Sequence, residues 1–543
     1  MHAKRSGAVL LLLLLIGGMV FATLSLADGP PRVTGWSDNP PTAASLVVGV
    51  PNEGSGAVTN AGIMQVIYGY ADFDFPGNPP TNSEYMGQTS STGGVNANDY
   101  FASALAVGDF NRDGYYDIAA GVPGEDNATG AVNIFYGSEN GFVTENKDYF
   151  AFTDIDPDGG SNDDNFGAAL TTGDFNGDGF TDLAVSAPGY DVSGTSVLTD
   201  AGTILFFWGS SNGLNENNNS QLYGDDPYAE YGFALAAADF DSDGKDDLVI
   251  GAPNNSTPAP ISNPARGGMV YIIYYSDITM WHQTSVDGGN DGDEDGDRFG
   301  AALAVGDFNG DGYPDLAIGA PGEDLEGDPF SMTDTGAMSI LYNDGTDLSA
   351  TGAQFWWQSN VSETQTPHNA SEASDQFGYA LAAGDFNNDG FDDLAVGTPY
   401  EDLTVNNNGT DTTYANIGLV QLIPGATVGL TTTTHPDIDI DALNPGDNQY
   451  RGVALAAGDF DSDGKDDIAI GLTGYTANGH PSAGAIRTCY DIFWDEGVSG
   501  STCFPSIVEA SPASPGDYEH YGTSLAVLPA PLSHRVYLPL ILR

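Results

Sequence analysis

The chain repeats one pattern of apolar and polar positions six times in full. The pattern begins with a short segment of small and apolar residues, continues with a polar loop rich in Asp, Asn and Gly, and returns to an apolar segment that ends at a Gly/Pro turn. The copy at 299–324, FGAALAVGDFNGDGYPDLAIGAPGED, shows every part. Short apolar segments bounded by turn residues are typical of buried strands, so each copy predicts two β-strands joined by the polar loop.

A third strand is predicted after a variable segment in each unit. It is richer in β-branched and aromatic residues, and its apolar positions partly alternate with polar ones. The clearest examples cover residues 131–137, 202–209, 268–275, 336–343 and 418–425. No segment after residue 27 has sustained helical periodicity. Several strands per unit without a helix favour the blade of a β-propeller over the coil of a solenoid.

The two ends of the chain carry complementary halves of the repeat. Residues 45–51 and 61–69 match the later strands of a unit, whereas residues 521–528 match its first strand. If these halves pair, six full units and one composite unit make seven blades, and no long strand edge stays unpaired. The predicted fold is all-β: a seven-bladed β-propeller closed by pairing of the N- and C-terminal half-repeats.

The segment before the propeller has the features of a secretion signal. Lys4 and Arg5 precede an apolar run at 8–22, and small residues before Ala27 predict cleavage after that residue. An uncleaved membrane anchor is the alternative, although the run is short for a span of about 20 apolar residues. No later segment is long enough to span a bilayer, and we expect a secreted or cell-surface protein. The predicted order is a signal peptide at 1–27, a linker at 28–42, the propeller at 43–528 and a short tail at 529–543.

The charge of the chain limits the kinds of partner that it can bind. Lys and Arg number 13 against 76 Asp and Glu, a formal net charge of −63. Such a surface repels phosphate backbones and anionic lipid headgroups, so we expect neither nucleic acid nor an anionic membrane as a partner. Hydrophobic residues make up 40% of the chain, enough for a core, so the acidity does not indicate disorder. A cation is the expected partner.

The polar loop has the composition of a calcium-binding loop. Alternate residues of a tight loop can turn their oxygens inward, and Gly312 permits the bend in the copy at 307–315. Hard oxygen donors at this density suit calcium better than zinc or copper. The predicted ligands of this copy are Asp307, Asn309, Asp311, Asp315 and the backbone carbonyl of Tyr313.

The other five copies place the same residue types at the same positions, so we expect about six Ca²⁺ ions. The predicted side-chain ligands are Asp109, Asn111, Asp113 and Asp117; Asp174, Asn176, Asp178 and Asp182; Asp239, Asp241, Asp243 and Asp247; Asp385, Asn387, Asp389 and Asp393; and Asp459, Asp461, Asp463 and Asp467. The predicted carbonyl ligands are those of Tyr115, Phe180, Lys245, Phe391 and Lys465.

An EF-hand is the main alternative to this interpretation. Its loop needs a bidentate Glu at the twelfth position and a helix on both sides. All six copies have an apolar residue there, inside a predicted strand. Aligning Tyr521 with Phe299 places Pro529 where Asp307 stands, so the seventh blade is expected to lack a loop of this type.

Cys489 and Cys503 are the two cysteines of the chain. An exported protein meets oxidising conditions, and two thiols without nearby His or further Cys make a poor zinc site. A single local disulfide between them is therefore predicted.

The copies also resemble a known repeat. The opening pair Phe299-Gly300, the closing Gly-Ala-Pro and the acidic loop between them are similar to the FG-GAP repeat of the integrin α-subunit N-terminal propeller. The resemblance covers about residues 43–528 and implies a seven-bladed propeller with calcium in loops on one face. Phe101-Ala102 and Arg451-Gly452 depart from the opening pair.

The expected function is recognition without catalysis. The chain has no H-E-x-x-H motif, and its one G-x-S-x-G spacing, at 209–213, recurs as a turn at 137–141 with Glu in the middle. We expect an extracellular adhesion or ligand-recognition module whose variable loops present a surface to a protein or glycan ligand. A structural protein of the cell envelope and a carbohydrate-active enzyme stay open as alternatives.

Overall fold

The computed structural model describes most of the predicted propeller. It covers residues 44–528 with gaps at 54–57, 69–82, 89–93, 139–140, 143–147, 157–159, 195, 257–264, 275–276, 288–293, 326–331, 362–370, 408–409, 433–436, 439–447, 477–483, 491–501 and 505–522. The expected signal peptide at 1–27, linker at 28–42 and tail at 529–543 lie outside the described residues.

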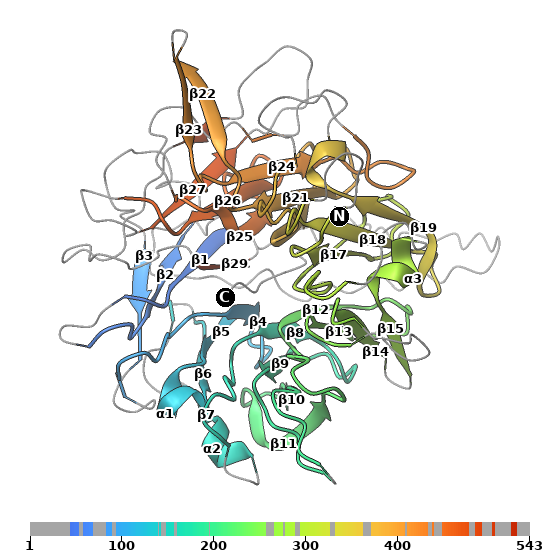
Figure 1. The fold of residues 1–543 in the computed structure, drawn as a ribbon. Coiled ribbons are helices and arrows are strands. Elements are labelled where there is room, and N and C mark those ends of the chain that lie inside the picture. The colour runs from blue at the N-terminus through green and yellow to red at the C-terminus, as the bar shows by residue number, and fades with distance from the viewer. Residues whose placement is uncertain are drawn as a thin grey trace, which may run out of the picture.

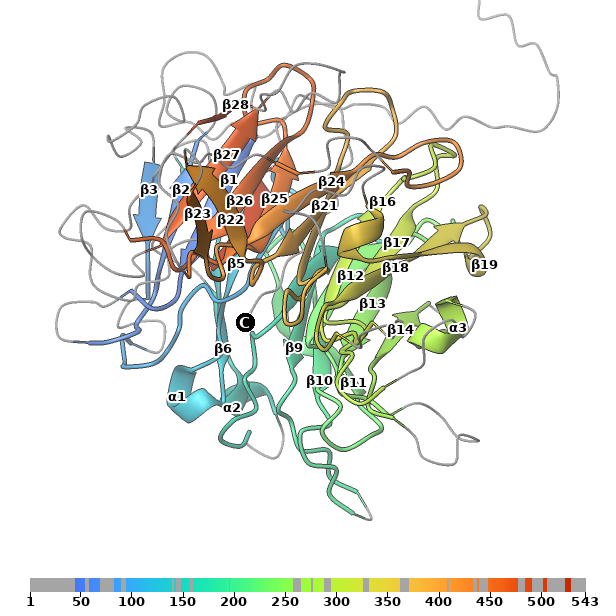
Figure 2. The ribbon, with the colours of Figure 1, turned by 45° about the horizontal axis from the view of Figure 1, so that its top comes forward.

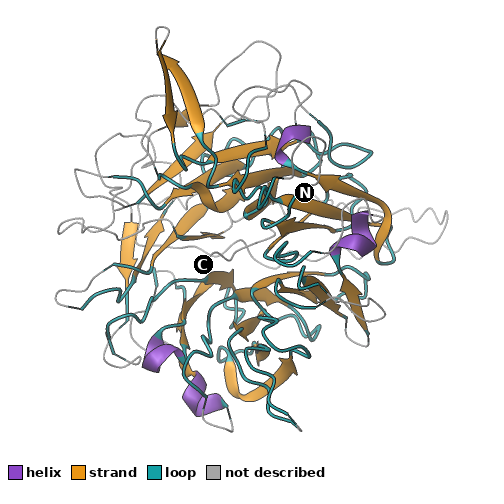
Figure 3. Ribbon diagram, viewed as in Figure 1, coloured by secondary structure: helices purple, strands orange, loops and turns teal. Residues whose placement is uncertain are grey.

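Seven antiparallel sheets surround a central axis, which confirms the predicted seven-bladed propeller (Figure 1). Figure 3 shows how far strands dominate the ring. We number the blades in chain order. Blade 1 contains β4 (Leu105–Gly108), β5 (Asp117–Val122), β6 (Ala131–Phe135) and β7 (Tyr149–Ala151); blade 2 contains β8 (Leu170–Gly173), β9 (Asp182–Ala187), β10 (Thr203–Trp208) and β11 (Asn215–Tyr223). Blade 3 contains β12 (Ala234–Ala238), β13 (Asp247–Ala252), β14 (Met269–Ile273) and β15 (Ile278–Trp281); blade 4 contains β16 (Ala302–Gly306), β17 (Asp315–Ala320), β18 (Ala337–Asn343) and β19 (Leu348–Trp356).

Blade 5 differs from the others. It contains β20 (Ala380–Gly384), β21 (Asp393–Thr398) and β24 (Leu419–Ile423), and the hairpin of β22 (Leu403–Asn407) and β23 (Thr410–Tyr414) is inserted before its third strand. This hairpin projects from the edge of the ring in Figure 1, and in the turned view of Figure 2 it lies in front of the strands of blade 6. Blade 6 contains β25 (Arg451–Gly458), β26 (Asp467–Leu472), β27 (Ala485–Tyr490) and β28 (Thr502–Phe504). The short helices α1 (Glu125–Ala128), α2 (Phe152–Ile155), α3 (Gln283–Asp287) and the 3₁₀ turn η1 (Gln358–Asn360) lie in loops.

The seventh blade is composite, as predicted from the half-repeats. It contains β29 (Ser524–Leu528), β1 (Ser45–Val50), β2 (Ile63–Ile67) and β3 (Ser83–Met86). Ser45 pairs with Leu528 and Gly49 with Ser524 across the antiparallel ladder of β1 and β29. The buried Ser524 hydroxyl also donates to the Ala102 carbonyl of blade 1 over 2.6 Å. The two ends of the described chain thus close the ring.

Residue size follows the distance from the axis. The inner strands β4, β12, β16 and β20 are built of Ala, Gly, Leu and Val, because the blades converge there and leave little room. Every residue of the second strand is buried in blades 1–6, as expected for a sheet covered on both faces. Outer strands such as β15 and β19 are partly exposed.

The hydrophobic core lies between neighbouring blades. One cluster joins residues of blades 2, 3 and 4, and another joins the composite blade to blades 1 and 6. The aromatic residue that follows the first loop Asp is fully buried at Phe110, Phe240, Phe308, Phe386 and Phe460. Packing between sheet faces therefore holds each blade against the next.

The second residue of the opening pair needs a left-handed backbone. Gly167 has φ +88°, and a Cβ there would lie 2.5 Å from the Ala131 carbonyl oxygen. Ala102, at the corresponding position of blade 1, has φ 64° although it carries a Cβ. Gly452 of blade 6 has φ +82°. The two copies that depart from the opening pair in sequence therefore keep its conformation.

Two further predictions concern the cysteines and the membrane. Cys489 on β27 lies opposite Cys503 on β28 in the strand register. This placement is compatible with the predicted disulfide, which stays a prediction. Among the described residues, no helix is long and apolar enough to span a bilayer.

Candidate metal centres

Each predicted metal loop joins the first strand of a blade to its second strand. The loops run from Asp109, Asp174, Asp239, Asp307, Asp385 and Asp459 to the Asp that opens β5, β9, β13, β17, β21 and β26. Since the blades share one strand order around the axis, all six loops lie on one face of the ring. In the composite blade, β29 and β1 come from opposite ends of the chain, so no loop connects them.

The first Asp of each loop anchors the backbone of the turn. In blade 4 the Asp311 N–H donates to Asp307 Oδ1 at 3.0 Å, and the Gly312 N–H donates to Asp307 Oδ2 at 2.8 Å. The other five loops repeat both bonds at 2.8–3.2 Å. The sequence therefore winds the chain around the carboxylate of its own first Asp, as Asx turns do.

The third and fifth residues of the loop continue this winding. Asn309 Oδ1 accepts from the Asp311 N–H at 2.9 Å, and Asp311 Oδ1 accepts from the Tyr313 N–H at 3.0 Å. Each bond uses one lone pair of an oxygen that has another available for a cation. The carbonyl oxygen of Tyr313 as a ligand stays a prediction, like those of its five counterparts.

The last Asp is buried and belongs to the sheet as well as to the loop. Asp315 is fully buried; its Oδ2 accepts from the Phe308 N–H at 3.1 Å and its Oδ1 from the Asn343 N–H, at the end of β18, at 2.8 Å. Asp117 makes the corresponding two bonds to Phe110 and Gly137 at 2.9 Å. This carboxylate ties the end of the loop to its beginning and to the end of the third strand of its blade.

Burial raises the pKa of these last Asp residues. The pKa rises to about 8 for Asp315 and Asp117 and to about 9 for Asp467, first because of desolvation and then because of repulsion by the other carboxylates of the loop. Ion pairs in the described loops join Lys245 to Asp243 and Lys465 to Asp463 at 3.7 Å, both at the surface. The buried carboxylates therefore lack a cationic side chain, and a divalent cation would supply the missing charge.

Several buried ligand oxygens also lack a hydrogen-bond partner. Among the described residues these include Asp182 Oδ2, Asn387 Oδ1 and Asp467 Oδ1, each at a predicted ligand position. A buried polar atom without a partner is rare in a folded protein unless water or an ion satisfies it. The donor set is all oxygen, which fits calcium.

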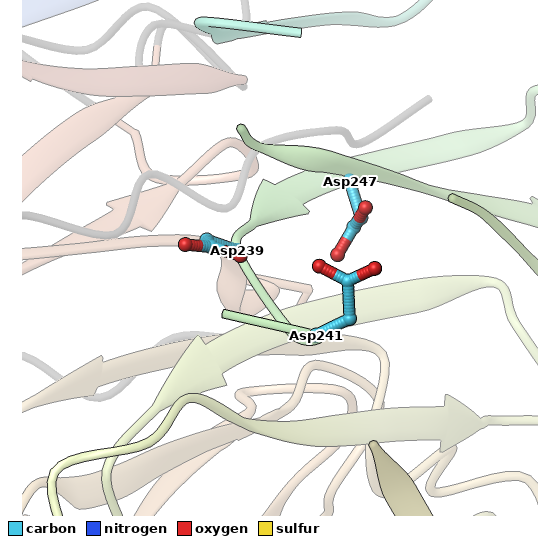
Figure 4. Close-up of side chains that lie close together, drawn as sticks. All are labelled: Asp239, Asp241 and Asp247. Atoms are coloured by element: carbon cyan, nitrogen blue, oxygen red, sulfur yellow. The ribbon is translucent and has the colours of Figure 1, made fainter. Parts of the chain in front are cut away.

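The structure brings the predicted ligands together. Asp239, Asp241 and Asp247 can each offer a carboxylate oxygen within 4.8 Å of the others, and so can Asp459, Asp461 and Asp463. In Figure 4 the carboxylates of Asp241 and Asp247 face each other, with Asp239 to one side. The other four loops have Asn at the third position, so their donor set mixes amide and carboxylate oxygens.

Sequence reasoning missed a link between neighbouring loops. In blade 5, Asp392 Oδ2 accepts from the Asp307 N–H of blade 4 at 2.8 Å, and the Asp392 N–H donates to the Asp307 carbonyl at 3.0 Å. Asp246 links to Asp174, and Asp466 to Asp385, in the same way. The available signal was the doubled Asp at 246–247, 392–393 and 466–467, which the other three loops lack.

A cavity of about 830 Å³ lies on the face opposite the loops. Blades 1 and 2 and the composite blade line it, mainly with the segments that precede their first strands and follow their second strands. Asn98, Tyr100, Asp163 and Asn165 in its wall have positive φ, an uncommon backbone that fixes where their side chains stand. The lining is rich in Asn and Asp.

Comparison with known proteins places these features in a family. A model of the FG-GAP repeat matches residues 101–135, 166–207, 231–273, 299–341, 377–414 and 451–488. Integrin alpha-PS2 of Drosophila melanogaster is 32% identical over 240 residues, which cover 44% of this chain and 15% of that protein. Phosphatidylinositol-glycan-specific phospholipase D of Bos taurus is 34% identical over 204 residues, which cover 36% of this chain and 22% of that protein. The matches thus span less than a quarter of the length of these relatives.

Among solved structures, a rhamnogalacturonan lyase of Bacillus licheniformis aligns with a TM-score of 0.33 and 12% identity, over 92% of this chain and 71% of that one. The six FG-GAP matches begin at the opening residue of blades 1–6 and contain all six loops. The chain is therefore an FG-GAP repeat protein, with a seven-bladed propeller similar to that of integrin α subunits.

Proposed function

We propose that the chain is an exported, calcium-stabilised propeller that recognises an extracellular protein or glycan without catalysing a reaction. The observation that carries the calcium part is the set of buried ligand oxygens without hydrogen-bond partners, such as Asp182 Oδ2 and Asp467 Oδ1, at predicted ligand positions. Calcium would neutralise carboxylates that repel one another and, in blades 1–6, would brace the loop that joins the first strand to the second.

Recognition is assigned to the opposite face, where the cavity of about 830 Å³ lies. Asn and Asp side chains can exchange hydrogen bonds with hydroxyl or amide groups, and Tyr100 adds an aromatic face. Because the surrounding backbone is held in an uncommon conformation, little ordering is needed when a ligand binds. Integrin alpha-PS2 among the relatives is consistent with a recognition role.

Removal of calcium tests the first part. We expect chelator to lower the melting temperature by many degrees, because binding to the native state alone stabilises it by mass action. Calorimetric titration of the metal-free protein should then return at least six ions. An unchanged melting temperature in excess chelator contradicts the calcium role.

Two matched substitutions test the second part. Tyr100 follows Asn98 in blade 1, and Tyr450 follows Asn448 in blade 6; both tyrosines have positive φ, and both hydroxyls approach the Asn Oδ1. Tyr100 lines the cavity and Tyr450 does not. In glycan-array and cell-surface binding, Tyr100→Ala should weaken binding at least tenfold while Tyr450→Ala leaves it unchanged. If both substitutions weaken binding equally, the cavity is not the ligand-binding site.

Enzymatic activity is the second candidate, because phosphatidylinositol-glycan-specific phospholipase D appears among the relatives. Incubation of the calcium-loaded protein with phosphatidylinositol-glycan substrates and with polysaccharides distinguishes the two. Turnover that survives repurification would replace the recognition proposal with an enzymatic one.

A further inference from the structure

Three blades contain a second cluster of buried acids, at the end of the blade away from the metal loops. Its members are a Glu after the second strand, an Asp before the first strand and a Gln after the outer strand of the preceding blade. The clusters are Asp99, Glu125 and Gln88 in blade 1; Asp297, Glu323 and Gln283 in blade 4; and Asp375, Glu401 and Gln358 in blade 5.

The Gln binds the Glu directly in all three clusters. The Nε2 atoms of Gln88, Gln283 and Gln358 donate to the Oε2 atoms of Glu125, Glu323 and Glu401 at 2.6, 2.5 and 2.6 Å. All six side chains are at least nine-tenths buried. The Glu and the Gln thus connect two neighbouring blades on this face.

The carboxyl groups repel one another. Burial raises the pKa of both Asp375 and Glu401, and the nearby Asp375 raises the pKa of Glu401 further, whereas the hydrogen bond with Glu401 lowers the pKa of Asp375. Burial and the nearby Asp99 raise the pKa of Glu125 to about 7. In the described residues, no ion pair brings a Lys or Arg to the clusters of blades 1 and 5. Each pair needs either a shared proton or a cation.

The glutamine oxygens distinguish these two possibilities. Oε1 of Gln88, Gln283 and Gln358 is buried and has no hydrogen-bond partner among the described residues. A proton shared by Asp and Glu would leave each of these carbonyl oxygens without a donor. A cation could instead be coordinated by the two carboxylates and by the amide oxygen. All of these ligand atoms are hard oxygens, which suit calcium.

In blades 1–6 the Glu and the Gln occur together. Blades 2, 3 and 6 have Tyr190, Asn255 and Tyr475 at the position of the Glu. Glu53 takes this position in the composite blade, but the sequence has no Gln between β28 and β29, so this blade has the Glu without the Gln. Blade 2 keeps the buried Asp164 without the Glu, and Ser161 Oγ donates to it at 2.6 Å. The acid pair is thus a feature of particular blades, not of every loop on this face.

We propose that the Asp–Glu–Gln clusters of blades 1, 4 and 5 are a second set of calcium sites, on the face opposite the six loops. In blade 1 the cluster adjoins the large cavity, because Asp99 and both neighbours of Glu125 line that cavity. A cation there would fix the segments that form the cavity wall. The inference does not depend on the loops binding calcium.

Ion counting on the full chain tests this set. After equilibrium dialysis against about 1 mM calcium chloride, the range of extracellular calcium modules, bound calcium is measured by mass spectrometry. Wild type should hold at least three ions more than the loops can account for. Glu401→Gln and Glu125→Gln, which keep the volume and an acceptor for the Gln, should each remove one ion. Asp164→Asn, the matched control in blade 2, should remove none.

The result separates the two sets of sites. Asp311→Ala removes a loop ion and leaves the clusters intact, so loss of an ion in Asp311→Ala but in neither Glu variant overturns the second set and leaves the loops standing. Loss of an ion in the Glu variants but not in Asp311→Ala supports the second set of sites and refutes calcium binding by the loops. Circular dichroism identifies a Glu variant that fails to fold, and the other then decides the question. Six ions in wild type with no change in either folded Glu variant would overturn the inference.

Discussion

Two kinds of aspartate share each metal loop. Asp311 is exposed, and its Oδ1 caps a single N–H of the turn. Asp315 is buried and accepts two N–H groups from different parts of its blade. In the proposed calcium site, Asp311 would therefore bind only the ion, whereas Asp315 would bind the ion and also hold the sheet.

This difference predicts unequal effects of two substitutions in one loop. In excess calcium, Asp311→Ala and Asp315→Ala should each remove one ion by calorimetry. Compared with Asp311→Ala, Asp315→Ala should also lower the free energy of unfolding, by about 1–3 kcal/mol for each buried N–H left without an acceptor. Urea unfolding in calcium measures this, with Asp344→Ala, an exposed loop residue, as the control. Equal stability of the two loop variants would show that Asp315 acts on the ion alone.

At the residue scale, the sequence predicted what is local. The loop ligands lie within nine positions of one another, so their spacing alone predicts that they converge. The sequence did not predict the buried clusters on the other face, because Gln88 and Glu125 are 37 residues apart and Gln358 and Glu401 are 43 residues apart. The variable segments between them hide the recurrence, which appears only when the blades are folded.

At the scale of strands and loops, the recurring pattern predicted the first three strands of a blade and the absence of long helices from the described residues. The outer strands were not predicted individually. β11 and β15 pair along one edge only and have few buried apolar residues. Their sequences therefore lack the apolar periodicity on which the prediction relied. Blade 5 shows how variable this layer is, since its hairpin β22–β23 pairs only with itself.

The link between neighbouring loops also acts at this scale. Asp392 lies in the loop of blade 5 but is not one of the predicted ligands, and it caps the first Asp of the blade 4 loop at 2.8 Å. Asp392→Ala should leave the number of bound ions unchanged and weaken the blade 4 site roughly tenfold, about 1.4 kcal/mol. Calcium titration of single and double variants measures the coupling.

The double variant Asp392→Ala/Asp311→Ala assigns the effect. Because Asp311→Ala empties the blade 4 loop, adding Asp392→Ala to it should change the remaining affinities very little. Thr181→Ala is the matched control, since Thr181 holds the corresponding position in blade 2. If the double variant shows a further tenfold loss of calcium affinity, Asp392 acts on a site other than the blade 4 loop.

For the whole molecule, the two half-repeats predicted ring closure. The sequence placed Pro529 where a loop Asp would stand, and this residue lies outside the described part. The structure supplies a topological reason: β29 and β1 meet by pairing alone, so the composite blade has no connection in which a loop of this type could form.

Closure by pairing predicts that the seven strands nearest the axis are stable only as a complete ring. A chain that ends at residue 522 lacks β29 and leaves β1 with an unpaired edge of buried apolar residues, among them Leu46 and Val48. Exposed edges of this kind associate with other chains. We expect this truncation to melt at a lower temperature and to form dimers or aggregates in light scattering, whereas a chain that ends at residue 528 stays monomeric and as stable as the full chain.

A peptide covering residues 523–529 provides the decisive control for this prediction. If the lost stability comes from the open β1 edge, the peptide should bind the chain that ends at 522, raise its melting temperature and suppress its association. It should not affect the chain that ends at 528, whose β29 already occupies that edge. A peptide with Asp at the position of Val527, a fully buried residue, should fail, because it would place a charge in the core. A monomeric and equally stable chain ending at 522 would mean that the six remaining blades hold together without closure.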